Sequence, residues 1–380
     1  MKITKLELLP VSKYLFLRVH TDEGITGLGE VGAWGYLCAV KGAIKKLENY
    51  LLGQDPCRIE HHWNYMYRSL YFRGAVVLSA LAAVDIALWD ILGKKLGVPV
   101  YQLLGGKCRD KVRTYAPVFE FEAEKMAEGC VKLKEQGFTA ARLMMCGRMD
   151  MNETAIEDDI FSHKVSDYVN RVAACRKAVG NDFDLCLEVH RSMTPAEAVA
   201  FAKGVEPYNP LFLEDPIPPD SVEAMAKVAD HINIPIATGE RAISLQEMES
   251  LIRHGAATYV RPDVCAIGGL TPCKKIAAVA EAGYVSIVPH NPLGPVSTAA
   301  CLQLDACVPN FLIQEFPSFY HSGSEDKMLK RSFQVEKGYI YIPDAPGIGI
   351  ELIDDIAEKF PPNQRDLTAQ ISYDGSVRDR

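Results

Sequence analysis

The 380-residue sequence lacks the features that would place it in several specialised classes of protein. It has no basic excess: 41 Lys and Arg stand against 49 Asp and Glu, a net charge of −8. This balance argues against binding to nucleic acid or to an anionic membrane surface. No apolar run approaches the roughly 20 residues that cross a bilayer, and the first residues lack the apolar core of a signal peptide. We therefore expect neither nucleic-acid nor membrane partners.

Cysteine motifs are also absent. The eleven cysteines are odd in number and contain no CxxC pair, so neither a disulfide framework nor a thiolate zinc site is indicated. Free thiols are typical of a reducing compartment, and the cytoplasm is the predicted location. We expect the cysteines to act as small core hydrophobes.

What the sequence does contain is a change of pattern near residue 112. Residues 1–35 read as strands and residues 38–105 as helices, and the apolar stretch Val76–Leu92 predicts a helix buried between layers. Beyond residue 112, eight short apolar runs alternate with seven amphipathic segments, which is typical of a doubly wound sheet or a (β/α)8 barrel. Eight near-equal units favour the barrel, and no glycine-rich phosphate loop follows the first run. The predicted strands are Val112–Phe119, Ala140–Met145, Asp184–His190, Leu211–Asp215, Ile234–Glu240, Tyr259–Val264, Tyr284–His290 and Phe311–Glu315.

Charged side chains recur where these predicted strands end. A single such charge is most often a solvated loop residue, but here one ends each strand from the third to the eighth. Because the C-terminal ends of barrel strands converge on one mouth, we expect the side chains to share a site. They are Glu188 with His190, then Glu214, Glu240, Asp263, His290 and Glu315.

Three of these carboxylates, Glu188, Glu214 and Glu240, fall on neighbouring strands. Carboxylates held together repel one another, and a hard divalent cation relieves that repulsion. Mg²⁺ prefers oxygen ligands, whereas zinc fits less well because no cluster of histidines or thiolates accompanies the three. Asp215 competes with Glu214 as the ligand, but a shift of one residue points a strand side chain to the opposite face. The sequence thus predicts a magnesium site formed by Glu188, Glu214 and Glu240.

Two histidines provide candidate acid–base groups. Asp263 and His290 end adjacent strands, and a carboxylate beside an imidazole orients it and raises its basicity, as a general base requires. His190 lies two residues beyond Glu188, so in a strand both side chains face the same way. Glu315 is expected to donate a hydrogen bond to a substrate carboxylate if it is kept protonated. For each of these groups a purely structural hydrogen bond or salt bridge is the alternative interpretation.

Several short motifs together resemble the enolase superfamily, mandelate racemase subgroup, and within it the acid-sugar dehydratases. The segment VPHNPLGPVSTAACLQLDACVPNFLIQE is most similar to galactonate dehydratases, and EVHRSMTPAEA to the mannonate dehydratase branch. The resemblance covers nearly the whole chain. The other motifs are Ala83–Asp90 with Gly93-Lys94, Leu103–Gly106, Leu213–Pro216, Gly239-Glu240, Arg261–Asp263 with Gly268-Gly269, and Pro346–Glu351.

The resemblance implies a fold and an organisation into domains. An α+β capping domain over residues 1–111 would lie on a (β/α)7β barrel over residues 112–335. Residues 336–380 would pack back on the capping domain and complete it, with residues 373–380 as a loose tail. The family also implies bound Mg²⁺ and a homo-oligomer of two to eight subunits.

The sequence departs from the family pattern at two positions. Many relatives carry a Lys-x-Lys pair on the second barrel strand, whereas this strand offers Arg142 and Met144, so a lysine base is absent and Arg142 is expected to contact substrate. The first metal ligand of most sugar-acid dehydratases is Asp, and here it is Glu188. Tyr14 and Trp34 are further expected substrate contacts, judged from their loop positions.

The reaction that the resemblance implies is loss of water from a sugar acid, such as galactonate, mannonate or gluconate, to give a 2-keto-3-deoxy acid. His290, oriented by Asp263, would remove the proton beside the carboxylate, and His190, as imidazolium, would protonate the departing hydroxyl. One alternative is an epimerase or cycloisomerase that uses His190 and His290 as opposed bases. Another is a non-catalytic member of the fold, because fold alone does not fix function.

Overall fold

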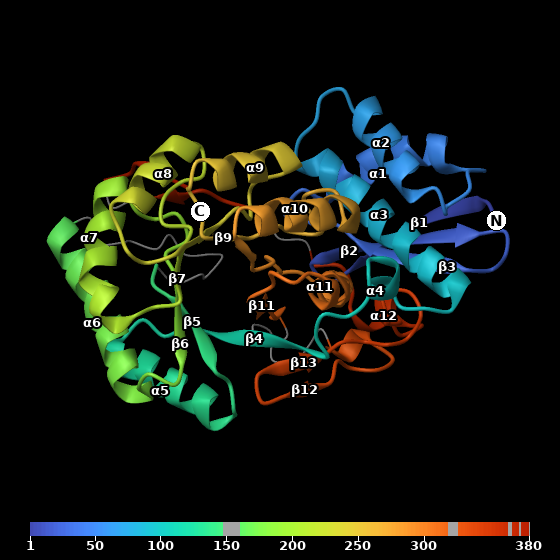
Figure 1. Ribbon diagram of the computed structural model, residues 1–380. Coiled ribbons are helices and arrows are strands. Elements are labelled where there is room, and N and C mark those ends of the chain that lie inside the picture. The colour runs from blue at the N-terminus through green and yellow to red at the C-terminus, as the bar shows by residue number, and fades with distance from the viewer. Residues whose placement is uncertain (147–159, 318–325, 364–366, 372–373, 380) are drawn as a thin grey trace.

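The computed structural model describes residues 1–146, 160–317, 326–363, 367–371 and 374–379. The chain begins with a three-stranded antiparallel sheet in the order β1-β2-β3, followed by a layer of helices (Figure 1). Its strands are β1 (Ile3–Val11), β2 (Tyr14–Thr21) and β3 (Thr26–Glu30). The helices are α1 (Leu37–Leu51), α2 (Ile59–Ser69), α3 (Ala75–Leu96) and the short α4 (Val100–Leu103).

Helix α3 is the buried helix that the sequence predicts. Glycines in β3 allow its close approach, since a Cβ at Gly27 or Gly29 would lie about 2 Å from the Ala87 or Ala83 carbonyl oxygen. The helix is longer than the sequence analysis expected of any apolar segment. It is the one helix among the described residues that is long and apolar enough to cross a membrane, but 72% of its most apolar stretch is buried inside the protein. Packing on both faces accounts for its composition.

Eight parallel strands then form the barrel, and each corresponds to a predicted strand. From β4 to β10, every strand pairs with the next along the chain. The ring closes through a bridge between Ile287 and Phe311 and through pairing of β11 with β4. The strands are β4 (Lys111–Val118), β5 (Ala140–Met144), β6 (Asp184–Glu188), β7 (Phe212–Glu214), β8 (Ile236–Thr238), β9 (Tyr259–Val260), β10 (Ser286–Ile287) and β11 (Gln314–Glu315).

Most of these strands are shorter than predicted. Glu240, Asp263 and His290 lie beyond the ends of β8, β9 and β10, whereas Glu188, Glu214 and Glu315 are the last paired residues of their strands. Helices alternate with the strands on the outside of the ring (Figure 1). Helix α7 begins with a capping box in which Thr194 and Glu197 satisfy each other's backbone N–H groups. These helices are α5 (Ala123–Glu135), α6 (Phe161–Val179), α7 (Pro195–Val205), α8 (Val222–Asp230), α9 (Leu245–Arg253), α10 (Leu270–Ala282) and α11 (Pro295–Cys307).

The C-terminal segment contacts both halves of the chain. Strand β12 (Val335–Glu336) forms a hairpin with β13 (Tyr339–Tyr341), and β13 pairs antiparallel with β4 of the barrel. Gly347 then exchanges backbone hydrogen bonds with Val98 and Val100, and α12 (Ile356–Lys359) contacts β1. The chain ends with the short hairpin of β14 (Gln370–Ile371) and β15 (Val377–Arg378). The expected packing on the N-terminal part is present, together with an additional contact to the barrel.

Two acidic residues of the N-terminal part lie at the N-termini of barrel helices. Asp85 of α3 accepts hydrogen bonds from the Thr271 backbone N–H (3.0 Å) and hydroxyl (2.6 Å) at the start of α10. Glu30 of β3 accepts from the backbone N–H groups of Gly294 (2.7 Å) and Ser297 (2.8 Å) at the start of α11. Backbone N–H groups at a helix N-terminus lack partners within the helix, and an acceptor oxygen from outside the helix satisfies them. These contacts fix the two halves of the protein against each other.

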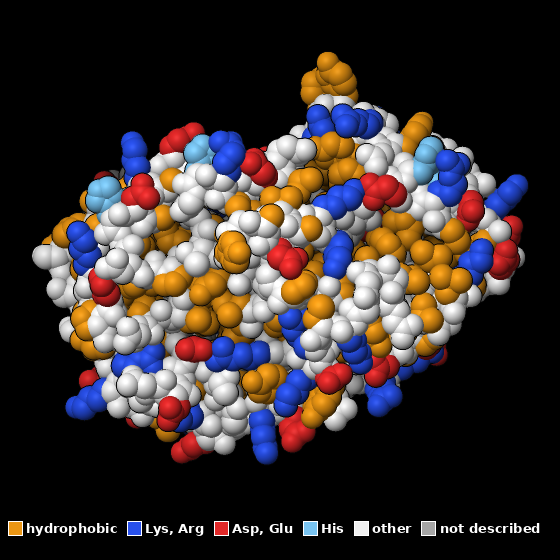
Figure 2. Space-filling view, in the orientation of Figure 1, with side chains coloured by type: hydrophobic (Ala, Val, Ile, Leu, Met, Phe, Trp, Pro, Cys, Tyr) orange, Lys and Arg blue, Asp and Glu red, His pale blue; other side chains and the backbone are white. Residues whose placement is uncertain are grey.

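Most of the cysteines lie in the core, as the sequence analysis expected, and the surface seen in Figure 2 carries mixed charge. Positive and negative side chains are interspersed over the face of described residues that Figure 2 shows. None of the eleven cysteines, all within the described residues, forms a disulfide bond; eight are buried, Cys57 is partly buried, and Cys38 and Cys108 are exposed. The aromatic side chains of Tyr71 and Phe72, in the loop between α2 and α3, are 84% and 87% exposed.

Candidate active site

The predicted site residues gather at the C-terminal ends of the barrel strands. Glu188 and Glu214 are the last residues of β6 and β7 and lie directly opposite each other in the ladder. Both are completely buried. Glu240, Asp263 and His290 follow β8, β9 and β10 by two or three residues, and Glu315 ends β11. The convergence follows from parallel pairing around a ring.

Arg142 of β5 links three of these carboxylates. Its Nη2 contacts Glu188 and lies 3.1 Å from Glu214 Oε1, and its Nη1 donates to Glu315 Oε1 at 2.9 Å. The side chain is 6% exposed. Arg142 therefore binds the carboxylates of the site itself, and contact with a substrate stays a prediction.

Arg261 is a site residue to which the sequence analysis gave no role. Its Nη2 lies 2.9 Å from both Glu214 Oε1 and Glu315 Oε2, and its Nη1 donates to the Tyr115 hydroxyl at 3.2 Å. It is completely buried, directly after β9. The sequence could have identified Arg261 from its position in the Arg261-Pro262-Asp263 motif. An arginine at the end of an apolar strand needs buried anionic partners.

Glu315 is a carboxylate and not the protonated hydrogen-bond donor that the sequence analysis considered. Burial alone would raise its pKa, but the Arg142 and Arg261 guanidinium groups lower it to about 2. The Asn291 backbone N–H also donates to Glu315 Oε2 at 3.0 Å. The earlier expectation treated Glu315 without these cations, which come from strands distant in the sequence.

His290 and Asp263 form the predicted pair. His290 Nδ1 lies 2.9 Å from Asp263 Oδ2, and Asp263 Oδ1 accepts from the backbone N–H groups of Cys265 (2.8 Å) and Ala266 (3.0 Å). His290 Nε2 lies 3.2 Å from Glu240 Oε2. Burial would lower the pKa of His290, but Glu240 and Asp263 together raise it to about 9. The carboxylate fixes the ring orientation and directs Nε2 toward the acidic cluster.

His190 reaches the cluster by a different route from the one predicted. Strand β6 ends at Glu188, and His190 (φ 48°) and Arg191 (φ 64°) adopt left-handed backbone conformations, so strand alternation does not set their direction. The His190 backbone N–H donates to Glu188 Oε1 at 2.5 Å. Burial, and then the adjacent Arg191 guanidinium, lower the pKa of His190 to about 4. In this arrangement His190 is neutral, not the imidazolium expected from the sequence.

Arg191 is a second residue missed from the sequence. Its Nη1 lies 2.5 Å from Glu240 Oε1 and 3.5 Å from Asp215 Oδ2, and its Nη2 lies 2.9 Å from His190 Nε2. The Thr238 hydroxyl donates to Asp215 Oδ1 at 2.5 Å. Asp215, the competing ligand, thus has two side-chain partners of its own. No simple pattern identified Arg191, because its direction depends on the left-handed turn that follows β6.

The two aromatic candidates differ in position. Tyr14 is 4% exposed at the start of β2, where it stacks on Phe16 in the hydrophobic core, so its assignment as a substrate contact is not supported. Trp34 is 38% exposed in the loop after β3. In that loop the Gly32 backbone N–H donates to the Cys265 carbonyl oxygen at 3.0 Å, which places the Trp34 loop against the loop that follows Asp263.

The charges of the site fit a divalent cation. Six carboxyl groups face three guanidinium groups and the protonated His290, so the cluster would carry an excess of negative charge if all six were ionised, and protonation of Glu214 relieves part of it. Burial and the neighbouring Glu188 carboxylate raise the pKa of Glu214 well above its usual range, and its buried oxygens accept no hydrogen bond of good geometry from the described residues. No complete set of metal ligands is already arranged among the described residues. The carboxylates are Glu188, Glu214, Asp215, Glu240, Asp263 and Glu315, and the guanidinium groups are Arg142, Arg191 and Arg261.

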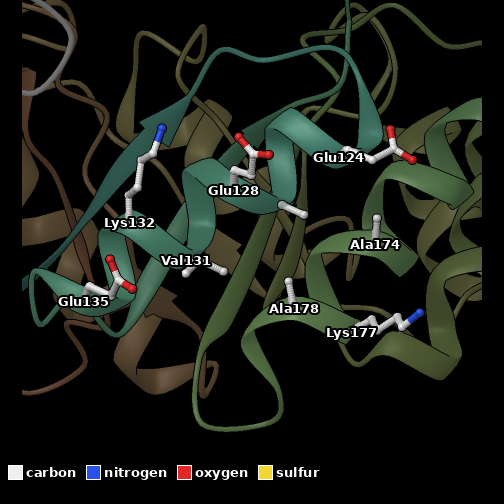
Figure 3. Close-up of a pocket in the computed structure, with 9 residues that line it drawn as sticks. Glu124, Glu128, Val131, Lys132, Glu135, Ala174, Lys177 and Ala178 are labelled. Carbon is white, nitrogen blue, oxygen red and sulfur yellow. The ribbon is translucent and has the colours of Figure 1, made fainter.

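A separate hollow lies on the outer surface between α5 and α6 (Figure 3). It measures about 700 Å³ and is lined by charged and small apolar side chains, among them Glu128, Lys132 and Lys177. It contains no histidine and lies on the outer helices, so it is not part of the acidic cluster.

Comparisons with known proteins place the chain in a family. Residues 8–105 match the mandelate racemase / muconate lactonizing enzyme N-terminal domain, and residues 125–356 match the enolase C-terminal domain-like family. D-galactonate dehydratases from Ralstonia pickettii and Pectobacterium atrosepticum are 40% and 38% identical, over 93% and 96% of this chain and 92% and 96% of theirs.

Solved structures agree with this placement. An enolase from Agrobacterium radiobacter, determined with Na and L-malate bound, is 28% identical, with a TM-score of 0.91 over the full length of both chains. An enolase superfamily member from Salmonella Typhimurium is 31% identical, with a TM-score of 0.87 over 95% of this chain and 98% of that chain. The fold, the strand-end carboxylates and these matches agree, and the chain belongs to the mandelate racemase / muconate lactonizing enzyme family of the enolase superfamily.

Proposed function

We propose that this protein is a hydro-lyase that removes water from a sugar acid and forms a 2-keto-3-deoxy acid. The observation that carries the proposal is the Asp263–His290 pair directed at a buried acidic cluster, in a chain whose curated relatives are D-galactonate dehydratases over more than 90% of both sequences. An aldonate such as galactonate, mannonate or gluconate is the proposed substrate class.

We propose Mg²⁺ as the cofactor, held by Glu188, Glu214 and Glu240. The excess of negative charge in the cluster and its all-oxygen donors are what such a hard cation requires. When bound, it would supply positive charge that favours loss of the proton beside the substrate carboxylate. Arg142 and Arg191, which now contact Glu188 and Glu240, would adjust when the cation binds.

The side chains of the site then have defined roles in the proposal. His290 Nε2, after giving up the proton that it carries in this structure, accepts the proton from the carbon beside the carboxylate, and Asp263 holds the ring through Nδ1. A cation held by Glu240 would favour that loss, because it offsets the negative charge that keeps the proton on His290. His190 delivers a proton to the departing hydroxyl, and it must take up that proton when the substrate binds, because the ring is neutral in this structure. Glu315 holds Arg142 and Arg261 in place as a carboxylate. Trp34 lies in a loop that borders the site and is the proposed substrate contact from the N-terminal part.

The location, assembly and domain division of the enzyme are further parts of the proposal. The free thiols support a reducing cytoplasm as its location. A homo-oligomer of two to eight subunits stays a prediction from the family. The division into residues 1–111, 112–335 and 336–380 also stays a prediction, as does the absence of nucleic-acid and membrane partners, which was inferred from the net charge and the lack of long apolar runs.

The test is a screen of a library of sugar acids for 2-keto acid formation, with Mg²⁺ and after its removal by a chelator. We expect one aldonate, or a few related by stereochemistry, to be dehydrated only with the metal. Turnover without any divalent cation would reject the metal assignment. If deuterium from the solvent enters the recovered substrate while no keto acid forms, the result would instead favour an epimerase.

A further inference from the structure

The end of the chain reaches the rim of the candidate site. The sequence analysis expected a loose tail over residues 373–380, but β15 pairs with β14 and is followed by Asp379, whose side chain contacts the barrel. Asp379 Oδ2 lies 2.5 Å from Arg241 Nη1 and 3.6 Å from Arg191 Nε. The Asp379 side chain is 32% exposed, while that of Arg191 is only 5% exposed.

Arg191 connects this contact to the reacting groups. The same guanidinium lies 2.5 Å from Glu240 Oε1 and 2.9 Å from His190 Nε2. Its backbone is in the left-handed region, which a non-glycine residue adopts only when its surroundings hold it there. The Arg191 side chain lies among four charged or polar partners, and Asp379 is the one supplied by the C-terminal segment.

The other end of the tail contacts the N-terminal part of the protein. Leu367 covers Gly35, in the loop that contains Trp34, so closely that a Cβ at Gly35 would lie 2.6 Å from Leu367 Cγ. From there the chain continues to Asp379 on the barrel. In Figure 1 this red segment extends from the side of α12 to the side of the view where α8 and α9 lie. The tail thus joins the Trp34 loop to the Arg191–Arg241 rim.

We infer that the C-terminal tail is a working part of the active site and that Asp379 is a positioning residue. By holding Arg191 and Arg241, Asp379 keeps the Arg191 guanidinium at the rim of the site when a cation takes its place beside Glu240. This inference rests on the proposed function for its effect on turnover, but the positioning itself is a property of the protein without substrate.

The experiment compares Asp379→Asn with two variants of the full-length protein. Asp379→Glu keeps the charge and should retain most activity. Asp374→Asn changes an exposed tail residue whose carboxylate accepts a local hydrogen bond from the Ser376 N–H (2.9 Å), and it should behave as wild type. In Asp379→Asn, the loosened Arg191 should lower kcat by about 10–100-fold with little change in KM, because small misplacements of catalytic groups have effects of this size.

Hydrogen–deuterium exchange without substrate provides the second readout. Exchange in residues 189–193 should rise in Asp379→Asn and stay at the wild-type level in Asp379→Glu and Asp374→Asn. If Asp379→Asn matches Asp374→Asn in both exchange and kcat, the inference is wrong. If the wild type turns over no sugar acid but the exchange pattern is as expected, the positioning role stands and the proposed function fails.

Discussion

His190 and His290 lie close to the same carboxylate cluster but have opposite surroundings. His290 faces Asp263 and Glu240, whereas His190 faces the Arg191 guanidinium. Two anions favour a proton on His290, and an adjacent cation disfavours one on His190. Such separation of two titratable groups is the arrangement by which acid and base roles are divided in active sites. The charged residues around each histidine, and not the histidines alone, therefore decide which ring removes the proton from the substrate.

The first prediction separates the two rings by isotope exchange. His290→Asn should abolish both keto acid formation and exchange of the α-proton of a true substrate in D₂O, because the proposed base is gone. His190→Asn should slow dehydration by about 10²–10⁴-fold, the usual range for loss of a general acid, while α-proton exchange continues. NMR of recovered substrate and a keto acid assay measure the two rates.

The opposite outcome has a definite meaning. Exchange that survives in His290→Asn and is lost in His190→Asn would show that His190 is the base. In this structure His190 is neutral and His290 carries a proton, so the proposed roles require both rings to change protonation state when the cation and the substrate bind. The exchange measured in the two variants tests whether they do.

At this scale the sequence predicts the anionic residues better than the cationic ones. Glu188, Glu214 and Glu240 recur at a regular spacing, so a barrel interpretation was enough to bring them together. Arg191 does not fall at this regular spacing, and Arg261 was noted only as part of the Arg261-Pro262-Asp263 motif. Each acquires its partners only when strands or loops from distant parts of the sequence converge. Tyr14 was misplaced because its position after a turn indicated a loop, whereas it is the first buried residue of β2.

At the scale of elements, Asp85 is a carboxyl group whose ionisation weakens the contact between α3 and α10. It is completely buried, and burial raises its pKa to about 7 although the Thr271 hydrogen bonds act in the opposite direction. In the unfolded chain this carboxyl has an ordinary pKa of 3.8. Between these two values the folded protein keeps the proton that the unfolded chain releases. The stabilising contribution of the protonated form is therefore complete below about pH 4 and is lost as the pH rises to about 7.

Asp85→Asn should remove this pH dependence. Asn keeps an oxygen that can accept from the Thr271 N–H, and it does not ionise. The free energy of unfolding of the variant should therefore rise relative to wild type by up to about 4 kcal/mol between pH 4 and pH 8. Urea titrations at several pH values measure the difference. Asp230→Asn, at an exposed position in α8, is the control, and an equal pH trend in both variants would contradict the assignment.

Element positions were predictable for a different reason from element lengths. Apolar runs and amphipathic segments alternate strongly enough to locate all eight barrel strands. Their ends were overestimated, as in the stretch 234–240, where only Ile236–Thr238 pairs. Near the mouth of the barrel the backbone leaves the hydrogen-bonded ladder and directs side chains into the site. The hydrophobic pattern of the sequence does not predict where this happens.

For the whole molecule, Gly347 is the point where the C-terminal segment meets the N-terminal part. It has φ +79°, and a Cβ there would lie 2.0 Å from Asp90 Oδ1. Asp90 accepts hydrogen bonds from the Ile348 N–H (2.9 Å) and the Leu28 N–H (2.9 Å), so it cannot move without loss of both. Gly347 thus combines a left-handed backbone conformation with a close approach to the Asp90 side chain.

Gly347→Ala should lower the free energy of unfolding of the whole protein by more than about 2 kcal/mol, through backbone strain and displacement of Asp90. Gly42→Ala is a matched control in α1, where no atom lies within 4 Å of the added methyl group, and it should be neutral or stabilising by up to about 1 kcal/mol. Denaturant unfolding monitored by Trp fluorescence measures both. Equal stabilities would mean that the segment does not hold the two parts together.

The buried cysteines have a practical consequence for the folded chain. A thiol-specific reagent attacks the thiolate, and burial both blocks its access and raises the pKa of sulfurs such as those of Cys265, Cys273 and Cys301. In the native protein only Cys38 and Cys108 are openly presented, with Cys57 at intermediate exposure. The other eight sulfurs become reactive as the structure opens. The number of cysteines that a thiol reagent modifies therefore indicates whether a preparation of the protein is folded or partly unfolded.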